Sequence, residues 1–213
     1  FLIGMSTSAF NIQPVKGWTG TVYIRADGSI DPPDAPISTV NYVTYTLTEN
    51  ITSDADGIVV ERSNIIIDGN GFTLQGETDY GFFLPERNNV TIKNTGIVGF
   101  SDGIGLYASS NNTISNNTLI SNRWFGISIQ GASIIHPSNN NTVINNTVTE
   151  SVCGIQFHGF SEYYNIIENN KVYLNDIGIQ LSESARNTTF RSNTISNNDY
   201  SLIIIDAPEG YEE

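Results

Sequence analysis

Apolar and polar residues alternate in short runs along most of the chain, and nearly every run follows a glycine. The runs begin at Gly57, Gly81, Gly103, Gly126, Gly154 and Gly178, and Ser201 takes the same place in the last run. Within a run the apolar residues stand two apart, as Ile127 and Ile129 do after Gly126. A period of two predicts a short β-strand with one buried face.

These runs recur at a nearly constant interval. Subtracting successive positions gives spacings of 24, 22, 23, 28, 24 and 23 residues. The one long spacing contains the segment ASIIHPSN, 132–139, and its Pro137 indicates a protruding loop. A repeat of this length cannot bury its apolar face alone, so successive coils are expected to stack around a shared core.

Asparagine recurs in one phase between the predicted strands. Three residues after the aligned apolar positions Ile67, Ile114, Val143, Ile167 and Phe190 stand Asn70, Asn117, Asn146, Asn170 and Asn193. Asparagine tolerates the left-handed backbone of a sharp bend, and its amide can bond to an identical neighbour in a strand stacked about 4.8 Å away. We therefore expect these five asparagines to form a ladder at one corner of the coils.

The pattern predicts an all-β fold, a single-stranded, right-handed parallel β-helix of about 7 coils of 22–24 residues with an N-terminal cap. The rival solenoid, the leucine-rich repeat, requires leucine at fixed positions, where this chain has few. Residues 43–207 are assigned to the β-helix. The proline-rich segment 10–42 is assigned to the cap that blocks pairing at the first edge, and 208–213 to a polar C-terminal end.

The first nine residues, FLIGMSTSA, are apolar and reach small residues at Thr7 and Ala9. This pattern resembles the end of a secretory signal peptide, so we assign residues 1–9 to a signal-peptide remnant and expect an extracytoplasmic location, secreted or at the cell surface. No segment of the fragment has the apolar length that a membrane span requires. Oligomeric state is not predicted.

The net charge of the chain limits the kinds of partner that its surface can bind. Lysine and arginine number 9 against 22 aspartates and glutamates, a net charge of −13, so most of the surface would repel a nucleic acid. The candidate copper ligands are few and scattered: Met5, His136, Cys153 and His158. Cys153 shares strand parity with Ile155 and is expected to be buried. We therefore predict no metal site and no cofactor, leave calcium open and argue against copper.

One strand face carries the residue types that bind sugars. By parity, Ser128, Gln156 and Gln180 should point outward in one column. Four further candidates flank this column: Tyr107, Trp124, Gln130 and His158. Amides next to aromatic rings can hydrogen-bond sugar hydroxyls and stack on sugar rings, so the predicted partner is a polysaccharide or cell-surface glycan. Trp124 could instead cover the core at a coil corner.

Three aspartates are weak catalytic candidates. Asp102, Asp176 and Asp199 precede the repeat position in their coils, and the last two are equivalent, which places them about 5 Å apart in stacked strands. Retaining glycosidases use such a separation between carboxylates, but an acidic solenoid also repeats aspartate by chance. A solvated or cation-bridged pair therefore stays open.

Several stretches resemble the NosD-like β-helix proteins, secreted or surface proteins common in archaea, whose repeats are grouped as carbohydrate-binding and sugar-hydrolase domains. They are GTVYIRADGSIDPPDAPIS, YTLTENI, GIVVERSNIIIDGNGFTLQG and the NNTISNN coils. The resemblance implies a surface β-helix but not one chemistry. We expect a carbohydrate-binding or scaffold module; the alternatives are a polysaccharide hydrolase, lyase or epimerase, and a copper-handling protein of the NosD type.

Overall fold

The computed structural model describes residues 17–159, 162–182 and 185–205. The segments predicted as signal-peptide remnant and polar end, 1–9 and 208–213, lie outside the described residues. All regular elements in the described part are strands, 25 in number, and they form three sheets. No described helix is long and apolar enough to cross a membrane.

Between Ile51 and Arg191, each coil of the chain contributes one strand to each of three sheets, in the order A, B, C. Sheet A contains β1 (Trp18–Thr19), β6 (Ile51–Ser53), β9 (Thr73–Gly76), β12 (Gly96–Val98), β15 (Thr118–Ile120), β18 (Thr147–Thr149), β21 (Lys171–Tyr173) and β24 (Thr194–Ser196). Sheet B contains β2 (Val22–Ile24), β3 (Ile30–Asp31), β7 (Ile58–Val60), β10 (Tyr80–Pro85), β13 (Asp102–Tyr107), β16 (Phe125–Gly131), β19 (Cys153–Gly159), β22 (Ile177–Ser182) and β25 (Tyr200–Ile205). Sheet C contains β4 (Ile37–Thr39), β5 (Thr44–Leu47), β8 (Ile65–Asp68), β11 (Val90–Lys93), β14 (Thr113–Ser115), β17 (Thr142–Ile144), β20 (Ile166–Glu168) and β23 (Thr189–Arg191).

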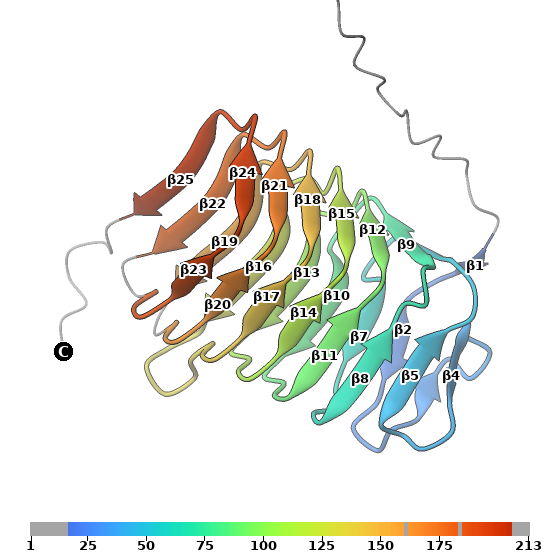
Figure 1. Ribbon diagram of the computed structural model, residues 1–213. Helices are drawn as coiled ribbons and strands as arrows, with labels where there is room; N and C mark the ends of the chain where they lie inside the picture. The colour runs from blue at the N-terminus through green and yellow to red at the C-terminus, as the bar shows by residue number, and fades with distance from the viewer. Residues whose placement is uncertain (1–16, 160–161, 183–184, 206–213) are drawn as a thin grey trace, which may run out of the picture.

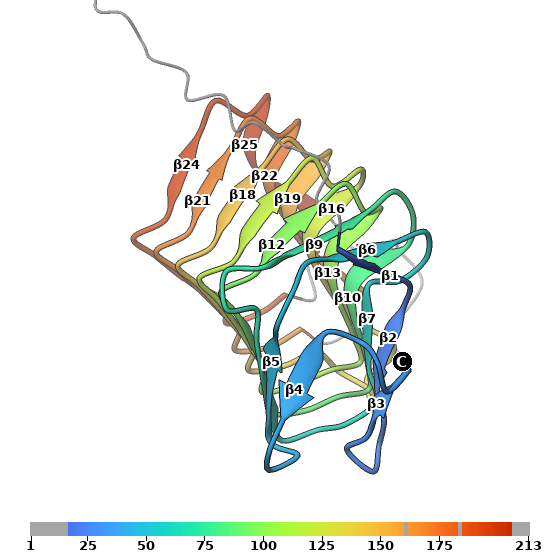
Figure 2. The same ribbon diagram turned by 90° about the vertical axis from the view of Figure 1, so that its right-hand side faces the viewer.

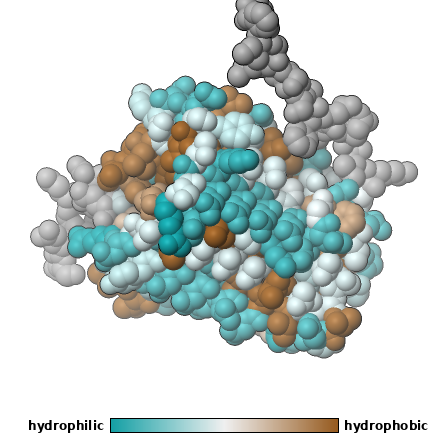
Figure 3. All heavy atoms as spheres, viewed as in Figure 1, coloured by the Kyte–Doolittle hydropathy of each residue, from teal (hydrophilic) through white to brown (hydrophobic). Residues whose placement is uncertain are grey.

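Neighbouring coils pair in parallel and in register, as Ile127 with Ile155 in sheet B and Val143 with Ile167 in sheet C. Figure 1 shows the coils as a stack, with equivalent strands side by side from β8 to β23. The molecule is therefore a right-handed parallel β-helix of about 7 coils, and the predicted fold is confirmed. The side turned to the viewer is largely hydrophilic (Figure 3).

The N-terminal end differs from the rest of the stack. Strands β3 and β4 pair antiparallel with β2 and β5 and end sheets B and C (Figure 2). Parallel pairing already begins at Trp18, which pairs with Ile51. Part of the segment predicted as the cap, 10–42, therefore belongs to the first coil.

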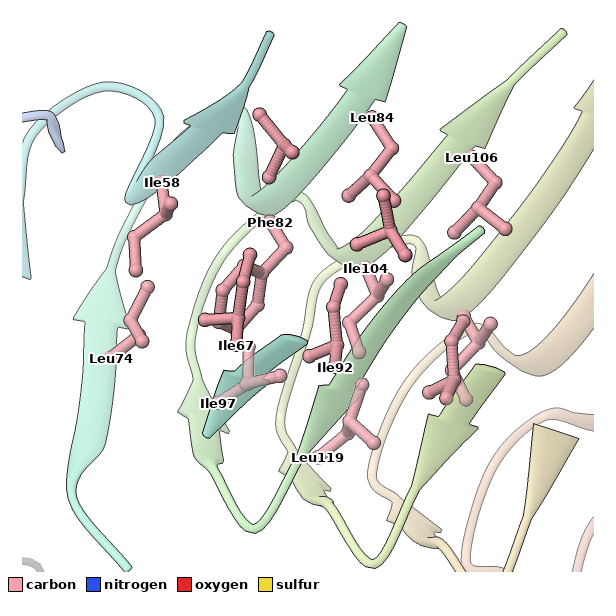
Figure 4. Packing of buried hydrophobic residues seen from close by; sticks show 14 of the residues in the cluster. Ile58, Ile67, Leu74, Phe82, Leu84, Ile92, Ile97, Ile104, Leu106 and Leu119 are labelled. Carbon is pink, nitrogen blue, oxygen red and sulfur yellow. The ribbon is translucent and has the colours of Figure 1, made fainter. Parts of the chain in front are cut away.

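The inward side chains of the three sheets fill the interior. Ile58, Phe82 and Ile104 form one column from sheet B, and Leu74, Ile97 and Leu119 form another from sheet A; all are fully buried (Figure 4). Stacking identical coils places like residues above one another. This gives one continuous apolar core. Burying apolar surface in it stabilises the folded state by about 25 cal/mol per Å².

The two residues of an asparagine pair have different conformations and different burial at the corners of the coils. At the corner between sheets C and A, the first residue of a pair adopts the left-handed conformation, as Asn116 (φ 56°) and Asn145 (φ 57°) do, and is exposed. The second residue of these pairs, Asn117 or Asn146, points inward and is buried. In the corner between sheets C and A, the amides of Asn117, Asn146 and Asn170 donate in turn to Oδ1 of Asn146, Asn170 and Asn193 at 3.0–3.1 Å.

Asn70 lies outside this series, contrary to the prediction. Four residues separate β8 from β9, against two between β11 and β12, and the longer turn carries Asn70 outward to an exposed position with φ 51°. The ladder instead ends at Thr95, whose backbone N–H donates to Asn117 Oδ1 at 3.1 Å.

Two further asparagine pairs at the other corners were not singled out from the sequence. At the corner between sheets B and C, Asn112 Nδ2 donates to Asn141 Oδ1 at 3.1 Å. At the corner between sheets A and B, Asn175 Nδ2 donates to Asn198 Oδ1 at 3.0 Å. All three corners are therefore braced by side-chain amides between coils.

Candidate functional site

The outer face of sheet B carries a column of exposed or half-buried polar and aromatic side chains. Strand register pairs Tyr107 with Gln130 and Gln130 with His158, so these three residues occupy one row in consecutive coils. Tyr107 is 37% exposed, His158 is exposed and Gln130 is half-buried. We call this row the Tyr107 column. It combines an aromatic ring, an amide and an imidazole at the strand spacing of about 4.8 Å.

The column predicted from parity lies next to it but offers less surface. Register pairs Ser128 with Gln156 and Gln156 with Gln180. Ser128 and Gln156 are only 8% exposed, while Gln180 is half-buried. A residue in the middle of a sheet face is shielded on both sides, so Gln156 presents little of its amide. The larger accessible area lies in the Tyr107 column.

The carboxylate of Glu162 links the ends of two strands of sheet B, a role that was not predicted from the sequence. Glu162 is fully buried; Gly131 N–H donates to its Oε1 at 3.0 Å and the Ser182 hydroxyl to its Oε2 at 2.9 Å. It thus ties the end of β16, next to Gln130, to the end of β22. The loop that follows Gly131 exposes Ile134 and Ile135 and closes on a bridge between Ser133 and His136.

Trp124 lies at the edge of sheet B opposite to the Tyr107 column. It directly precedes β16, whereas Gln130 is near the strand's far end. Trp124 is 48% exposed, and the Arg123 guanidinium lies 5.3 Å from its ring centroid. The structure therefore does not bring Trp124 together with the Tyr107 column.

Asp176 and Asp199 border the same edge as Trp124. Tyr200 N–H donates to the Asp176 carbonyl at 2.8 Å, which places Asp176 and Asp199 in neighbouring coils just before their strands. Both are exposed. In the coil between those of Trp124 and Asp176, the equivalent position is Val152. Its carbonyl accepts from Ile177 N–H, just as the Asp176 carbonyl accepts from Tyr200 N–H.

Asp102 has a different environment from the other two candidates. It pairs with Tyr80 and Phe125 within sheet B and is half-buried. Burial raises the pKa of its carboxyl to about 7, while the hydrogen bond from the Phe125 backbone opposes the rise. Burial and the Asp102 charge also raise the pKa of Tyr80, whose ring stacks on Phe83 at a centroid distance of 4.6 Å. A carboxyl that titrates near neutral pH can serve as a general acid or base.

The possible copper ligands are not gathered in the described part of the chain. Cys153 is fully buried, and burial raises the pKa of its thiol to about 12, so it stays protonated rather than forming the thiolate that binds metals. His136 is on the loop after β16 and His158 is on β19. The described residues contain no group of three His, Cys, Asp or Glu side chains placed to hold a metal ion. Met5, the remaining candidate, lies outside the described residues.

The alternation that predicted inward and outward residues fails at the repeat glycines. A Cβ on Gly154 would come within 2.5 Å of Val172 Cγ1, so this glycine faces the interior, as the next residue, Ile155, also does. Parity counted from Ile155 therefore does not extend back to Cys153. The thiol is nevertheless fully buried.

The fold places the protein among the parallel β-helix proteins, and two family models match it. The chain belongs to the family described as right handed beta helix region, whose model matches residues 23–164. A model described as periplasmic copper-binding protein (NosD) matches residues 128–210. The resemblance to NosD-like β-helix proteins is thereby confirmed, and the description suggests an extracytoplasmic location. No curated protein matches the chain.

Proposed function

We propose that this chain is an extracytoplasmic β-helix module that binds carbohydrate through the outer face of sheet B. The observation that carries the proposal is the Tyr107 column, in which Tyr107, Gln130 and His158 follow one another in register. An accessible ring supplies stacking area, and the amide and imidazole supply donors and acceptors for hydroxyl groups. The sheet fixes the backbone positions of all three residues, which lowers the entropic cost of binding.

The test is binding of the purified protein to a panel of polysaccharides, measured by affinity electrophoresis and calorimetry. Tyr107→Ala should weaken binding about fivefold or more, as expected for loss of roughly 1 kcal/mol of ring contact. Tyr173→Ala is the matched control, because Tyr173 is a half-buried tyrosine on sheet A. Equal losses in the two variants, or no glycan bound at all, would contradict the proposal.

A polysaccharide-modifying enzyme is the second candidate, favoured by the raised pKa of Asp102. The same incubations distinguish it if released or unsaturated products are recorded. Product formation that Asp102→Asn or Asp176→Asn abolishes would establish catalysis. Retention without product supports a binding or scaffold module.

Copper handling is the third candidate, and the NosD match over residues 128–210 supports it. The buried, protonated Cys153 argues against it, because copper is bound by a thiolate and not by a thiol. Titration with Cu(I) and Cu(II) under anaerobic and aerobic conditions tests this candidate. Stoichiometric binding that is lost in His158→Ala would favour copper over carbohydrate.

A further inference from the structure

Seven asparagines of the chain stand in the sequence Asn-x-Ser/Thr, the motif that accepts N-linked glycans in secreted proteins. They are Asn50, Asn89, Asn111, Asn116, Asn140, Asn145 and Asn187. All of them except Asn50 adopt the left-handed conformation at a corner of the coils and are exposed. Where the motif overlaps an asparagine pair, as in 116–118, it begins at the exposed Asn116, and the buried Asn117 is its second residue. The motif therefore presents its acceptor amide to solvent.

The third residue of the motif, which carries the hydroxyl, also reaches the outside of the solenoid. Strand register aligns Thr91, Thr113 and Thr142 on sheet C and Thr118 with Thr147 on sheet A, and all five are half-buried. Each lies two residues after its asparagine, close to the corner from which the strand begins. The amide and the hydroxyl of the motif can therefore be approached together from solvent.

The left-handed conformation of a corner does not by itself require asparagine. At the corner between sheets A and B the corresponding residues are Ser121, Glu150 and Leu174, with φ of 53°, 60° and 57°. These residue types adopt the conformation although asparagine tolerates it better. The backbone geometry of the corners therefore does not account fully for the asparagines of the motif.

The exposed motif asparagines form two rows that border sheet C, whose strands lie side by side in Figure 1. The row between sheets B and C contains Asn89, Asn111, Asn140 and Asn187, and the row between sheets C and A contains Asn116 and Asn145. Asn111 N–H donates to the Asn139 carbonyl, so Asn111 and Asn140 are in adjacent coils. Asn116 N–H donates to the Ile144 carbonyl, which likewise places Asn116 one coil from Asn145. Each row thus offers more than one acceptor along the solenoid axis.

We propose that the six exposed asparagines of these two rows are acceptor sites for N-linked glycans. The proposal goes beyond carbohydrate binding, because the sugar is attached covalently at the corners next to sheet C rather than held on the outer face of sheet B. It rests on the extracytoplasmic location, since the motif is modified in secreted proteins.

The co-reactant is an oligosaccharide carried on a polyprenyl phosphate or diphosphate lipid, together with the transferase that uses it. Nδ2 of the asparagine forms a bond to C1 of the first sugar, and the bond between C1 and the phosphate oxygen breaks. The lipid phosphate leaves with the electron pair of that bond, and one amide proton passes to a base of the transferase. The step changes no oxidation state.

Glycopeptide mass spectrometry of the protein purified from its natural source tests the proposal. Digestion after denaturation removes polysaccharide that is only bound, so the remaining sugar mass is covalent. Fragmentation that preserves the linkage should locate glycans on asparagines of both rows, Asn116 among them. The buried ladder residues Asn117 and Asn146, which do not begin a motif, should carry none.

Substitutions at the third residue of the motif, made in the same source, separate recognition of the motif from other modification. Thr118→Val keeps Asn116 and its corner but removes the hydroxyl, and should lower glycan occupancy at Asn116 at least about tenfold. Thr118→Ser keeps a hydroxyl and should retain the glycan. Thr194→Val is the matched control, because Thr194 is the equivalent residue of β24 and Ser192, two residues before it, is not an acceptor.

Sugar-free peptides covering all six asparagines would overturn the proposal, whatever the protein binds on sheet B. A wild-type Asn116 without glycan, or a glycan on Asn116 that survives Thr118→Val, would refute motif-directed attachment at that corner. Polysaccharide binding is measured separately, so its failure would leave the glycan sites standing.

Discussion

At the residue scale, each buried asparagine of the ladder forms hydrogen bonds with several groups of the neighbouring coils. Asn146 Oδ1 accepts from both the backbone and the side-chain N–H groups of Asn117, and its Nδ2 donates to the Ile114 carbonyl at 2.9 Å. A buried amide left unpaired costs about 1 to 3 kcal/mol. The ladder therefore stabilises the fold only while the coils stay in register.

Asn146→Leu should lower the free energy of unfolding by about 2 to 4 kcal/mol, because it leaves the N–H groups of Asn117 and the Ile114 carbonyl without their partner. Asn145→Leu is the control: Asn145 is exposed, and only its left-handed backbone is strained by the change, at about 1 kcal/mol. Urea unfolding measures both. Equal losses would remove the ladder from the explanation of stability.

The Asp102 carboxyl predicts a pH dependence of stability. Its pKa is raised to about 7 in the folded protein, so the fold favours the protonated acid. Its contribution is complete below the unfolded pKa, near 4, and is lost as pH rises through 7.

Asp102→Asn should therefore be more stable than the wild type at pH 8 by about 1 kcal/mol, a discounted value because the carboxyl is partly solvated. The two proteins should converge near pH 4. Thermal melts between pH 4 and 8 measure this difference. A stability difference that does not change with pH would show that burial does not control this carboxyl.

At the element scale, the repeat glycines are required by the close stacking of strands. A Cβ built on Gly154 would lie 2.6 Å from the Gly178 carbonyl oxygen, and one on Gly126 would lie 2.6 Å from that of Gly154. Real Cβ atoms do not approach carbonyl oxygens so closely. Ser201 takes the glycine position in the last described coil, where it is exposed.

Gly154→Ala should destabilise the protein by about 2 to 3 kcal/mol, because the methyl group overlaps the backbone of the next coil and Val172. Ser201→Ala at the equivalent position should change stability by less than about 0.5 kcal/mol. Denaturant unfolding of the two variants tests the difference. A tolerant Gly154 would mean that the coils can separate locally at low cost.

At the scale of the whole molecule, the two ends of the described solenoid differ. Antiparallel strands β3 and β4 end two sheets at one end. In the last described coil, Leu202 and Ile204 occupy inward register positions, yet they are 50% and 63% exposed. Because these two side chains bury less apolar surface than their counterparts in the interior coils, local stability should decline toward that coil.

Native-state hydrogen exchange should show this gradient. Amides of β23 to β25 are expected to exchange at least about tenfold faster than those of β17 to β19, because the inward residues of β25 bury less apolar surface than those of the interior coils. The interior strands serve as the reference within the same sample. Uniform protection over all coils would indicate that the solenoid opens as one cooperative unit.

The sequence by itself determined the β-helix, the spacing of its coils from Gly57 onward and its insertion loop, because these follow from a period of two within strands and a period near 23 between coils. It did not reveal that the first coil already begins at Trp18, because the segment before Tyr42 lacks the repeat pattern. The sequence could not predict that Asn70 lies outside the ladder, since two extra turn residues change which side chain points inward. It also could not rank Gln156 against His158, or separate Trp124 from Gln130, because shielding and distance across a sheet depend on neighbouring coils. Only the tertiary structure set the strand register that aligns Tyr107, Gln130 and His158 and the burial that raises the pKa of Asp102.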